Sequence, residues 1–137
     1  MIKPMKLGVM FIAGAIGITA LTSYNIEAAS KVPTERQIIV EMHKMANNYI
    51  IADDIRGKEE MTQKRLTALT DELNAVEIEA DFPHKKHLLE ILTIWKQGEF
   101  FMLANDHNYL WAALDGQIGK ATGVKEKKDL PAWTTDN

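Results

Sequence analysis

The sequence predicts an all-α fold, a small bundle of about four short helices that follows an N-terminal signal or anchor helix. Apolar residues recur every three or four positions in four segments, and no strand-like alternation extends beyond a few residues. The chain has 137 residues, which is enough for one domain. We expect three parts: a signal peptide or membrane anchor at 1–29, a helical domain at 30–124 and a loosely ordered tail at 125–137.

The first segment has the features of an export signal. Lys3 and Lys6 precede a mostly apolar run over 7–22, and small residues follow up to Ala29. If this segment is not cleaved, residues 7–26 are long enough to span a bilayer of about 30 Å. The lysines orient the segment so that the rest of the chain lies outside the cytoplasm. The domain is therefore expected to be extracytoplasmic, either secreted or anchored to the cell membrane.

Composition excludes several classes of protein. The chain has 16 basic and 19 acidic residues, and a mildly acidic protein lacks the basic surface that nucleic-acid binding requires. It has no cysteine, which excludes disulfides, thiolate nucleophiles and cysteine metal sites. The fold must therefore be stabilised by its apolar core.

Capping residues mark the first two helices. Thr34 and Gln37 form a capping box, after which an apolar stripe predicts a helix that fades at Asp53 and Asp54. Thr62 can cap the second helix. The two stripes comprise Ile38, Met42, Met45, Tyr49 and Ala52, and then Leu66, Leu69, Leu73 and Val76.

Proline and glycine delimit the last two helices. Pro83 is suited to the first turn of the third helix, and Gly98 is a natural residue just beyond its end. The fourth helix is expected to start near Glu99 or Phe100 and to end at Gly116. The apolar residues of these helices are Leu88, Ile91 or Leu92 and Trp95, and then Phe100, Leu103, His107, Leu110 and Leu114.

The stretch from Asp106 to Gly123, DHNYLWAALDGQIGKATG, has the highest density of chemically special residues. Gly119-Lys120 suggests a phosphate loop, but that motif needs a glycine where Leu114 stands and a serine or threonine where Ala121 stands. The favoured interpretation is a helix end followed by a glycine-rich turn. Exposed backbone N–H groups with Lys120 could also hold a small anion or a carboxylate.

Four histidines are candidates for chemistry. His84 and His87 could share a zinc ion, but flanking lysines and the lack of a nearby third ligand favour a solvated face. His43 and His107 lie at or beside apolar stripes, where a histidine is usually a hydrogen-bonded core group. If these two face one another, they form a polar pair inside the bundle.

Aromatic residues suggest a second kind of site. Tyr109 and Trp111 together with Lys120 could line the rim of a binding groove, because aromatic residues are frequent anchors at interfaces. The alternative is that both rings pack in or beside the core.

Several motifs together resemble a known family. They are Met42-His43-x-Met45, Met61-Thr62-x-x-Arg65, Ile91-Leu92-x-x-Trp95-x-x-Gly98, Asp106-His107-Asn108-Tyr109-x-Trp111 and Gly116-x-Ile118-Gly119-Lys120-Ala121-x-Gly123. The pattern resembles the domain-of-unknown-function family number 6241, small exported proteins of spore-forming Gram-positive bacteria. The resemblance implies an exported single domain and no activity. Asn47 stands where the family has a second histidine, which places a paired-histidine site on the first helix in doubt.

Two functional hypotheses follow. The leading one is a non-enzymatic extracytoplasmic module that binds a partner protein or a cell-envelope component, with no catalytic residue, metal or cofactor assigned. Its expected binding residues are His107, Tyr109, Trp111, Gly116, Gly119 and Lys120. The alternative is a small hydrolase or metal-dependent enzyme that uses His107 with His43 or Asp106. A buried His107 argues for the first hypothesis, and a His107 that lines an open pocket argues for the second.

Overall fold

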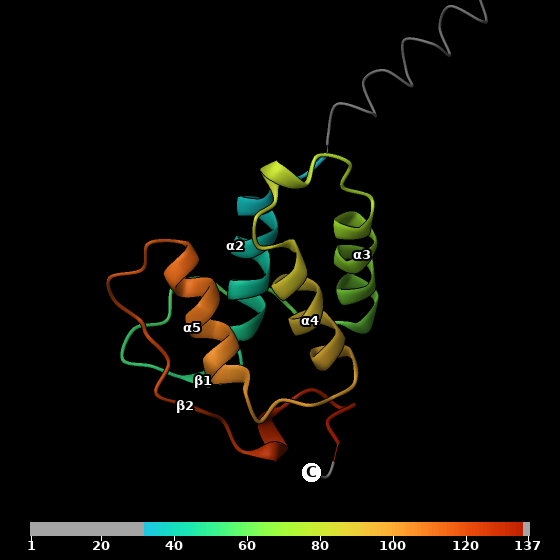
Figure 1. The fold of residues 1–137 in the computed structure, drawn as a ribbon. Coiled ribbons are helices and arrows are strands. Elements are labelled where there is room, and N and C mark those ends of the chain that lie inside the picture. The colour runs from blue at the N-terminus through green and yellow to red at the C-terminus, as the bar shows by residue number, and fades with distance from the viewer. Residues whose placement is uncertain (1–31, 136–137) are drawn as a thin grey trace, which may run out of the picture. The chain divides into compact units, whose positions relative to one another are not determined.

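A computed structural model describes residues 32–135 of the chain, so the predicted export segment at 1–29 lies outside the described residues. Within the described part, four α-helices follow one another: α2 (Glu35–Ala46), α3 (Gln63–Asn74), α4 (Lys85–Lys96) and α5 (Leu103–Ala113) (Figure 1). The prediction of a mostly helical fold with about four short helices is confirmed. In residues 32–135, no helix is long and apolar enough to cross a membrane.

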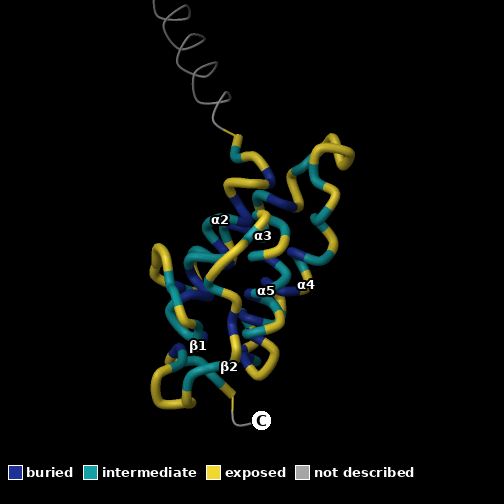
Figure 2. The backbone as a smooth tube through the Cα atoms, turned by 90° about the vertical axis from the view of Figure 1, so that its left-hand side faces the viewer, coloured by how far each residue is buried: buried dark blue, intermediate teal, exposed yellow. Residues whose placement is uncertain are grey.

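The helices associate in two pairs, α2 with α5 and α3 with α4. Figure 2 shows the buried stretches of the backbone on the helices and the exposed stretches mostly in the loops. The predicted stripes supply most of the core, which includes Ile38, Met42, Met45, Leu66, Leu69, Leu73, Leu88, Ile91, Leu92, Trp95, Leu103 and Leu110. Burial of this apolar surface is the main source of stability.

Polar contacts at the helix ends agree with the predicted caps. Thr34 and Gln37 form the capping box of α2, and the Thr62 hydroxyl accepts from the Arg65 N–H at the start of α3. The Arg65 side chain then donates to both carboxylate oxygens of Glu41 at 2.6 Å, which joins α3 to α2.

The first helix is shorter than predicted. It ends at Ala46, and the side chains of Asn47 and Asn48 donate to backbone carbonyls in the following loop. The chain then forms β1 (Ile50–Ile51), which pairs antiparallel with β2 (Gly123–Val124) in a register of Ile50 with Val124. The prediction of helix through Tyr49 and Ala52 is therefore wrong. The sequence does not reveal β1, because two residues are too few to produce an alternating pattern and because the strand forms only by pairing with a distant segment.

Other boundaries also differ from the sequence-based expectation. Val76 lies beyond the end of α3, Pro83 precedes the N-cap residue His84, and α5 begins at Leu103 rather than near Glu99. Gly98 has a φ of +79°, as expected just after a helix. After α5 the left-handed position is taken by Asp115, with a φ of +58°, and not by Gly116.

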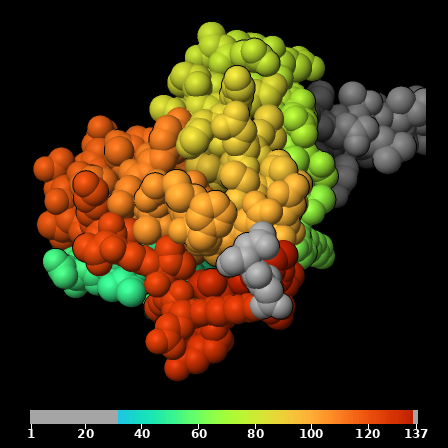
Figure 3. Space-filling view, turned by 60° about the horizontal axis from the view of Figure 1, so that its bottom comes forward, coloured from blue at the N-terminus to red at the C-terminus, as the bar shows by residue number. Residues whose placement is uncertain are grey.

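The C-terminal segment contacts the end of α4. It contains the short 3-10 helix η2 (Lys127–Asp129); a second, η1 (Glu79–Asp81), lies before α4. The Trp133 indole N–H donates to the carbonyl of Trp95 at 2.9 Å, and the Thr135 N–H donates to that of Gly98 at 2.9 Å. Figure 3 shows this red segment across one end of the molecule. These hydrogen bonds and the half-buried Trp133 ring attach the segment to the end of α4.

Candidate functional site

The glycine loop, residues 114–122 after α5, lies beside the 52–58 loop that follows β1 (Figures 1 and 3). Gly119 has a φ of +87°, and a Cβ added there would lie 2.5 Å from the carbonyl oxygen of Asp54. A Cβ added to Gly116 would lie 2.4 Å from the indole of Trp111. These two glycines allow the backbone to approach the neighbouring loop and the tryptophan.

Several hydrogen bonds fix the glycine loop. Asn108 on α5 binds the backbone of Ala121 twice, accepting from its N–H at 2.8 Å and donating to its carbonyl at 3.0 Å. The Trp111 indole N–H donates to the carbonyl of Ile118 at 2.8 Å, and the Thr122 N–H donates to that of Ile51 at 2.7 Å. These hydrogen bonds hold the glycine loop in one conformation.

Between the two loops lies a groove of about 470 Å³, here called the loop groove. Its lining residues are Asp53, Asp54, Trp111, Gln117, Ile118, Gly119, Lys120 and Thr122. The Ile118 side chain is 55% exposed. The backbone N–H groups of residues 117–120 have no hydrogen-bond partner in the described part of the chain. The loop groove is thus lined by apolar surface and by four residues whose backbone N–H groups are unpaired.

A polar cluster between α2 and α5, here called the histidine hub, is made of the buried residues Asn47 and His107 and the half-buried residues His43 and Asn108. His107 is 0% exposed. Its Nε2 lies 2.9 Å from Oδ1 of Asn47, and its Nδ1 lies 3.0 Å from Oδ1 of Asn108. The amide of Asn47 donates in turn to the carbonyl of Gly57 at 2.8 Å. The hub is therefore hydrogen-bonded to the 52–58 loop through Asn47 and to the glycine loop through Asn108.

His43 completes the hub through ring contact. Its ring centroid lies 4.5 Å from that of His107, with 34° between the ring planes. Burial and the charge of His107 lower the pKa of His43 to about 4. Burial also lowers the pKa of His107, although the hydrogen bond with Asn108 acts against this shift. Both imidazoles are therefore neutral at neutral pH.

A second polar cluster surrounds Tyr109, away from the loop groove. The Tyr109 hydroxyl lies 2.6 Å from Nδ1 of His84, and its ring centroid lies 4.1 Å from that of His87. Glu35 accepts from the His84 backbone N–H at 3.0 Å. The two histidines were predicted to lie on a solvated face: both contact the tyrosine, while the His87 side chain remains 45% exposed and lies 3.4 Å from the Glu90 carboxylate.

Asp106 belongs to the seam between α4 and α5 rather than to the hub. Its carboxylate accepts from the Trp95 indole N–H at 3.0 Å. Burial raises the pKa of Asp106, while this hydrogen bond and the charge of His87 act in the opposite direction. Asp106 is thus engaged with Trp95 rather than with His107.

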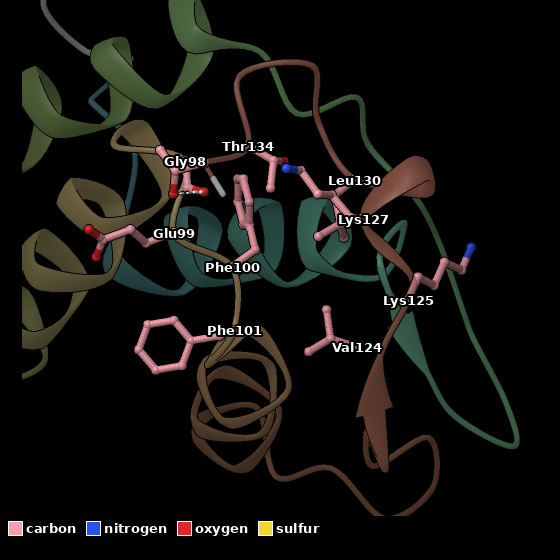
Figure 4. Close-up of a pocket in the computed structure, with 10 residues that line it drawn as sticks. Gly98, Glu99, Phe100, Phe101, Val124, Lys125, Lys127, Leu130 and Thr134 are labelled. Atoms are coloured by element: carbon pink, nitrogen blue, oxygen red, sulfur yellow. Dashed lines mark hydrogen bonds between the residues drawn. The ribbon is translucent and has the colours of Figure 1, made fainter. Parts of the chain in front are cut away.

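A further hollow of about 200 Å³ lies at the end of the molecule covered by the C-terminal segment (Figure 4). Figure 4 shows Phe100, Val124 and Leu130 around it, from three separate segments. Beside them, Phe101 is 71% exposed. The sequence did not indicate this hollow, since its lining residues come together only in the fold.

The structure gathers part of the predicted site. Trp111, Gly116, Gly119 and Lys120 meet at the glycine loop, whereas His107 lies buried beneath it and Tyr109 lies in the other cluster. The residues missed by sequence reasoning are Asn47, Asp53, Asp54, Asn108 and Ile118, of which only Asn47 and Asn108 carried a signal, as polar residues next to apolar stripes. Across residues 32–135, no group of three or more histidine, aspartate or glutamate side chains could hold a metal ion.

A model of a family of unknown function, DUF6241, matches residues 42–133. The chain belongs to this family. The matched span includes the histidine hub and both walls of the loop groove, so these are features of the part of the chain that defines DUF6241 membership. No curated protein and no solved structure matches the chain.

Proposed function

We propose that this protein is an extracytoplasmic binding module that holds an extended segment of a partner protein in the loop groove. The observation that carries the proposal is that one groove is lined by the Trp111 ring from α5 and by a fixed loop with an exposed Ile118 and unpaired N–H groups at residues 117–120. The lysines and apolar run at the N-terminus support the extracytoplasmic location.

The chemistry of the loop groove favours a peptide as its occupant. Unpaired backbone donors can bind the carbonyl groups of an extended chain, and an apolar side chain of the partner can pack on Trp111 and Ile118. Charges of both signs, from Asp53 and Lys120, line the same groove. A polyanionic envelope polymer suits this mixture less well, because Asp53 would repel it.

The enzyme alternative receives less support from the geometry. His107 has no exposed surface, both of its ring nitrogens face asparagine side chains, and Asp106 points to Trp95. A general base must reach the substrate proton directly or through one water. The buried position of His107 instead suits a role in supporting the two loops.

A matched pair of substitutions tests the proposal. Ile118→Glu places a charge in the loop groove, while Ile78→Glu places one at a similarly exposed isoleucine (65% exposed, against 55% for Ile118) that does not line the groove. The full chain, in each variant, is cross-linked in the cells that produce it, and the captured material is identified by mass spectrometry. We expect a captured protein that disappears with Ile118→Glu and persists with Ile78→Glu. Equal capture by both variants, or capture of a polysaccharide only, would reject the proposal.

A further inference from the structure

The side of α4 that faces away from the core is partly apolar. The buried residues of α4 share one side of the helix, whereas Leu89 and Ile94 are only partly buried. Two shallow hollows, of about 330 Å³ and 420 Å³, meet along the other side, since both are lined by Lys86 and Leu89. Together they form one surface, here called the α4 strip, which comprises Phe82, Lys86, Leu89, Glu90, Thr93 and Ile94. Figure 3 shows the yellow and gold atoms of this segment open at the surface.

The two charges of the α4 strip are not paired with each other. Lys86 and Glu90 are both exposed and stand about one helical turn apart. A lysine that precedes a glutamate by four residues is in the less favourable order for a pair within a helix. Glu90 lies 3.4 Å from Nδ1 of His87 instead, and Lys86 has no ion-pair partner in residues 32–135. Both charges are therefore available to another molecule.

A second copy of the chain carries the complementary charges in the matching order. A two-fold axis that crosses α4 at residue 88 exchanges positions 86 and 90, so Lys86 of each copy lies opposite Glu90 of the other. Leu89 is about 1.5 Å along the helix from that axis, and the two Leu89 side chains therefore meet beside it. From this self-complementary order of charges we propose that the α4 strip is a docking surface for a second copy of this chain, with the two α4 helices antiparallel.

The size of the α4 strip determines what kind of dimer is expected. One helix face buries less than the roughly 1,200 Å² at which stable interfaces begin, so the dimer is weak and depends on concentration. A lipid surface suits the strip less well, because the exposed Glu90 stands among its apolar residues. The α4 strip shares no residue with the loop groove, and the inference therefore goes beyond the proposed function.

Single thiols test which parts of two copies meet, because the chain has no cysteine of its own. Leu89→Cys places a thiol beside the axis, whereas the thiols of two Ile94→Cys chains lie about 18 Å apart along the helices. The full chain is treated, in the cells that produce it, with a thiol cross-linker of about 8 Å, which matches the distance between packed helices. We expect Leu89→Cys to be cross-linked to itself on the order of tenfold more than Ile94→Cys. Equal yields, or a higher yield for Ile94→Cys, would overturn the proposal.

Charge reversal tests whether the partner is a second copy. In the Leu89→Cys chain, Lys86→Glu or Glu90→Lys brings like charges together at both contacts and should lower the yield on the order of tenfold. Lys64→Glu, at an exposed lysine of α3 outside the strip, should leave the yield unchanged. Co-production of the Lys86→Glu and Glu90→Lys chains restores opposite charges and should return cross-linked pairs of one chain of each kind. Failure of this mixture to recover the yield contradicts a self-complementary contact.

Sedimentation of the unaltered full chain gives a readout without cysteine. We expect a monomer–dimer equilibrium that moves towards the monomer in Lys86→Glu and not in Lys64→Glu. A monomer at every concentration, or a dimer that persists in Lys86→Glu, rejects the dimer. Neither result affects capture of a partner by the loop groove, which is tested at Ile118.

Discussion

At Gly119 the backbone has a φ of +87°, and the carbonyl of Asp54 occupies the space that a side chain would need. Alanine at this position would combine a left-handed backbone with a Cβ only 2.5 Å from that oxygen. We expect Gly119→Ala to lower the free energy of unfolding by about 2 kcal/mol, measured by urea denaturation. Gly123→Ala is the control, since its Cβ would meet only the Cδ1 of Ile51 at 3.6 Å. Equal losses in the two variants would mean that the close approach at Gly119 is not tight.

Asn108 is the residue that ties the glycine loop to α5. Its side chain replaces a strand partner by binding both the N–H and the carbonyl of Ala121. Removal of both bonds in Asn108→Ala should lower the free energy of unfolding by about 2 kcal/mol and increase proteolysis within residues 114–122. Asn105→Ala, at an exposed position of the same helix, should change neither measurement. Cleavage of the glycine loop at equal rates in both variants would contradict this role.

At the scale of elements, Arg65 links α3 to α2. Its two bonds to Glu41, at 2.6 Å each, form a bidentate pair, with Glu72 nearby at 3.3 Å. Lysine cannot form the bidentate contact, so Arg65→Lys should lower the free energy of unfolding by up to about 1 kcal/mol. Arg56→Lys changes a more exposed pair with Asp54 and should have no measurable effect. Urea denaturation at low and at high salt checks both, and a salt-independent loss would exclude an electrostatic cause.

The elements that the sequence predicts well are those whose pattern is local. Leu66, Leu69 and Leu73 fall on one face of a helix whatever its neighbours are, and all three are buried as expected. β1 was not predictable in this way, because its two residues form a strand only by pairing with Gly123 and Val124. The early end of α2 has a similar origin. The Asn47 side chain, just beyond the helix, donates to the carbonyl of Gly57, ten residues further along the chain, and the sequence pattern does not show this contact.

In the candidate site, too, the residues with local signals could be predicted from the sequence, and those that depend on distant contacts could not. The glycines and Trp111 were recognisable because their backbone freedom and aromatic character are properties of the residues themselves. Asp53 and Asp54 seemed to be only a helix-ending pair, and they line the loop groove because β1 brings them to the glycine loop. Sequence spacing also cannot reveal that Tyr109, on another helix, contacts both His84 and His87.

For the whole molecule, the histidine hub predicts acid-dependent stability. The pKa of His43 is about 4 in the folded chain and 6.5 in the unfolded chain, so the unfolded state binds the proton more tightly in between. Stability is therefore complete above pH 6.5 and decreases as the pH falls towards 4. The loss from His43 is on the order of 2 kcal/mol after allowance for partial exposure of its ring. His107, whose pKa is also lowered by burial, adds to the loss in the same direction.

Asp106 has the opposite effect on stability in acid to that of the two histidines. Its pKa is raised by burial, so the folded state binds the carboxyl proton more tightly than the unfolded state and stability increases as that proton is taken up. Asp106→Asn removes this compensation and should make the acid loss steeper, whereas His43→Phe should make it shallower. Urea denaturation of both variants between pH 7 and pH 4 separates the two contributions. If both variants lose stability in parallel with the unaltered chain, neither buried group controls the acid response, and the exposed carboxylates of the surface must account for it.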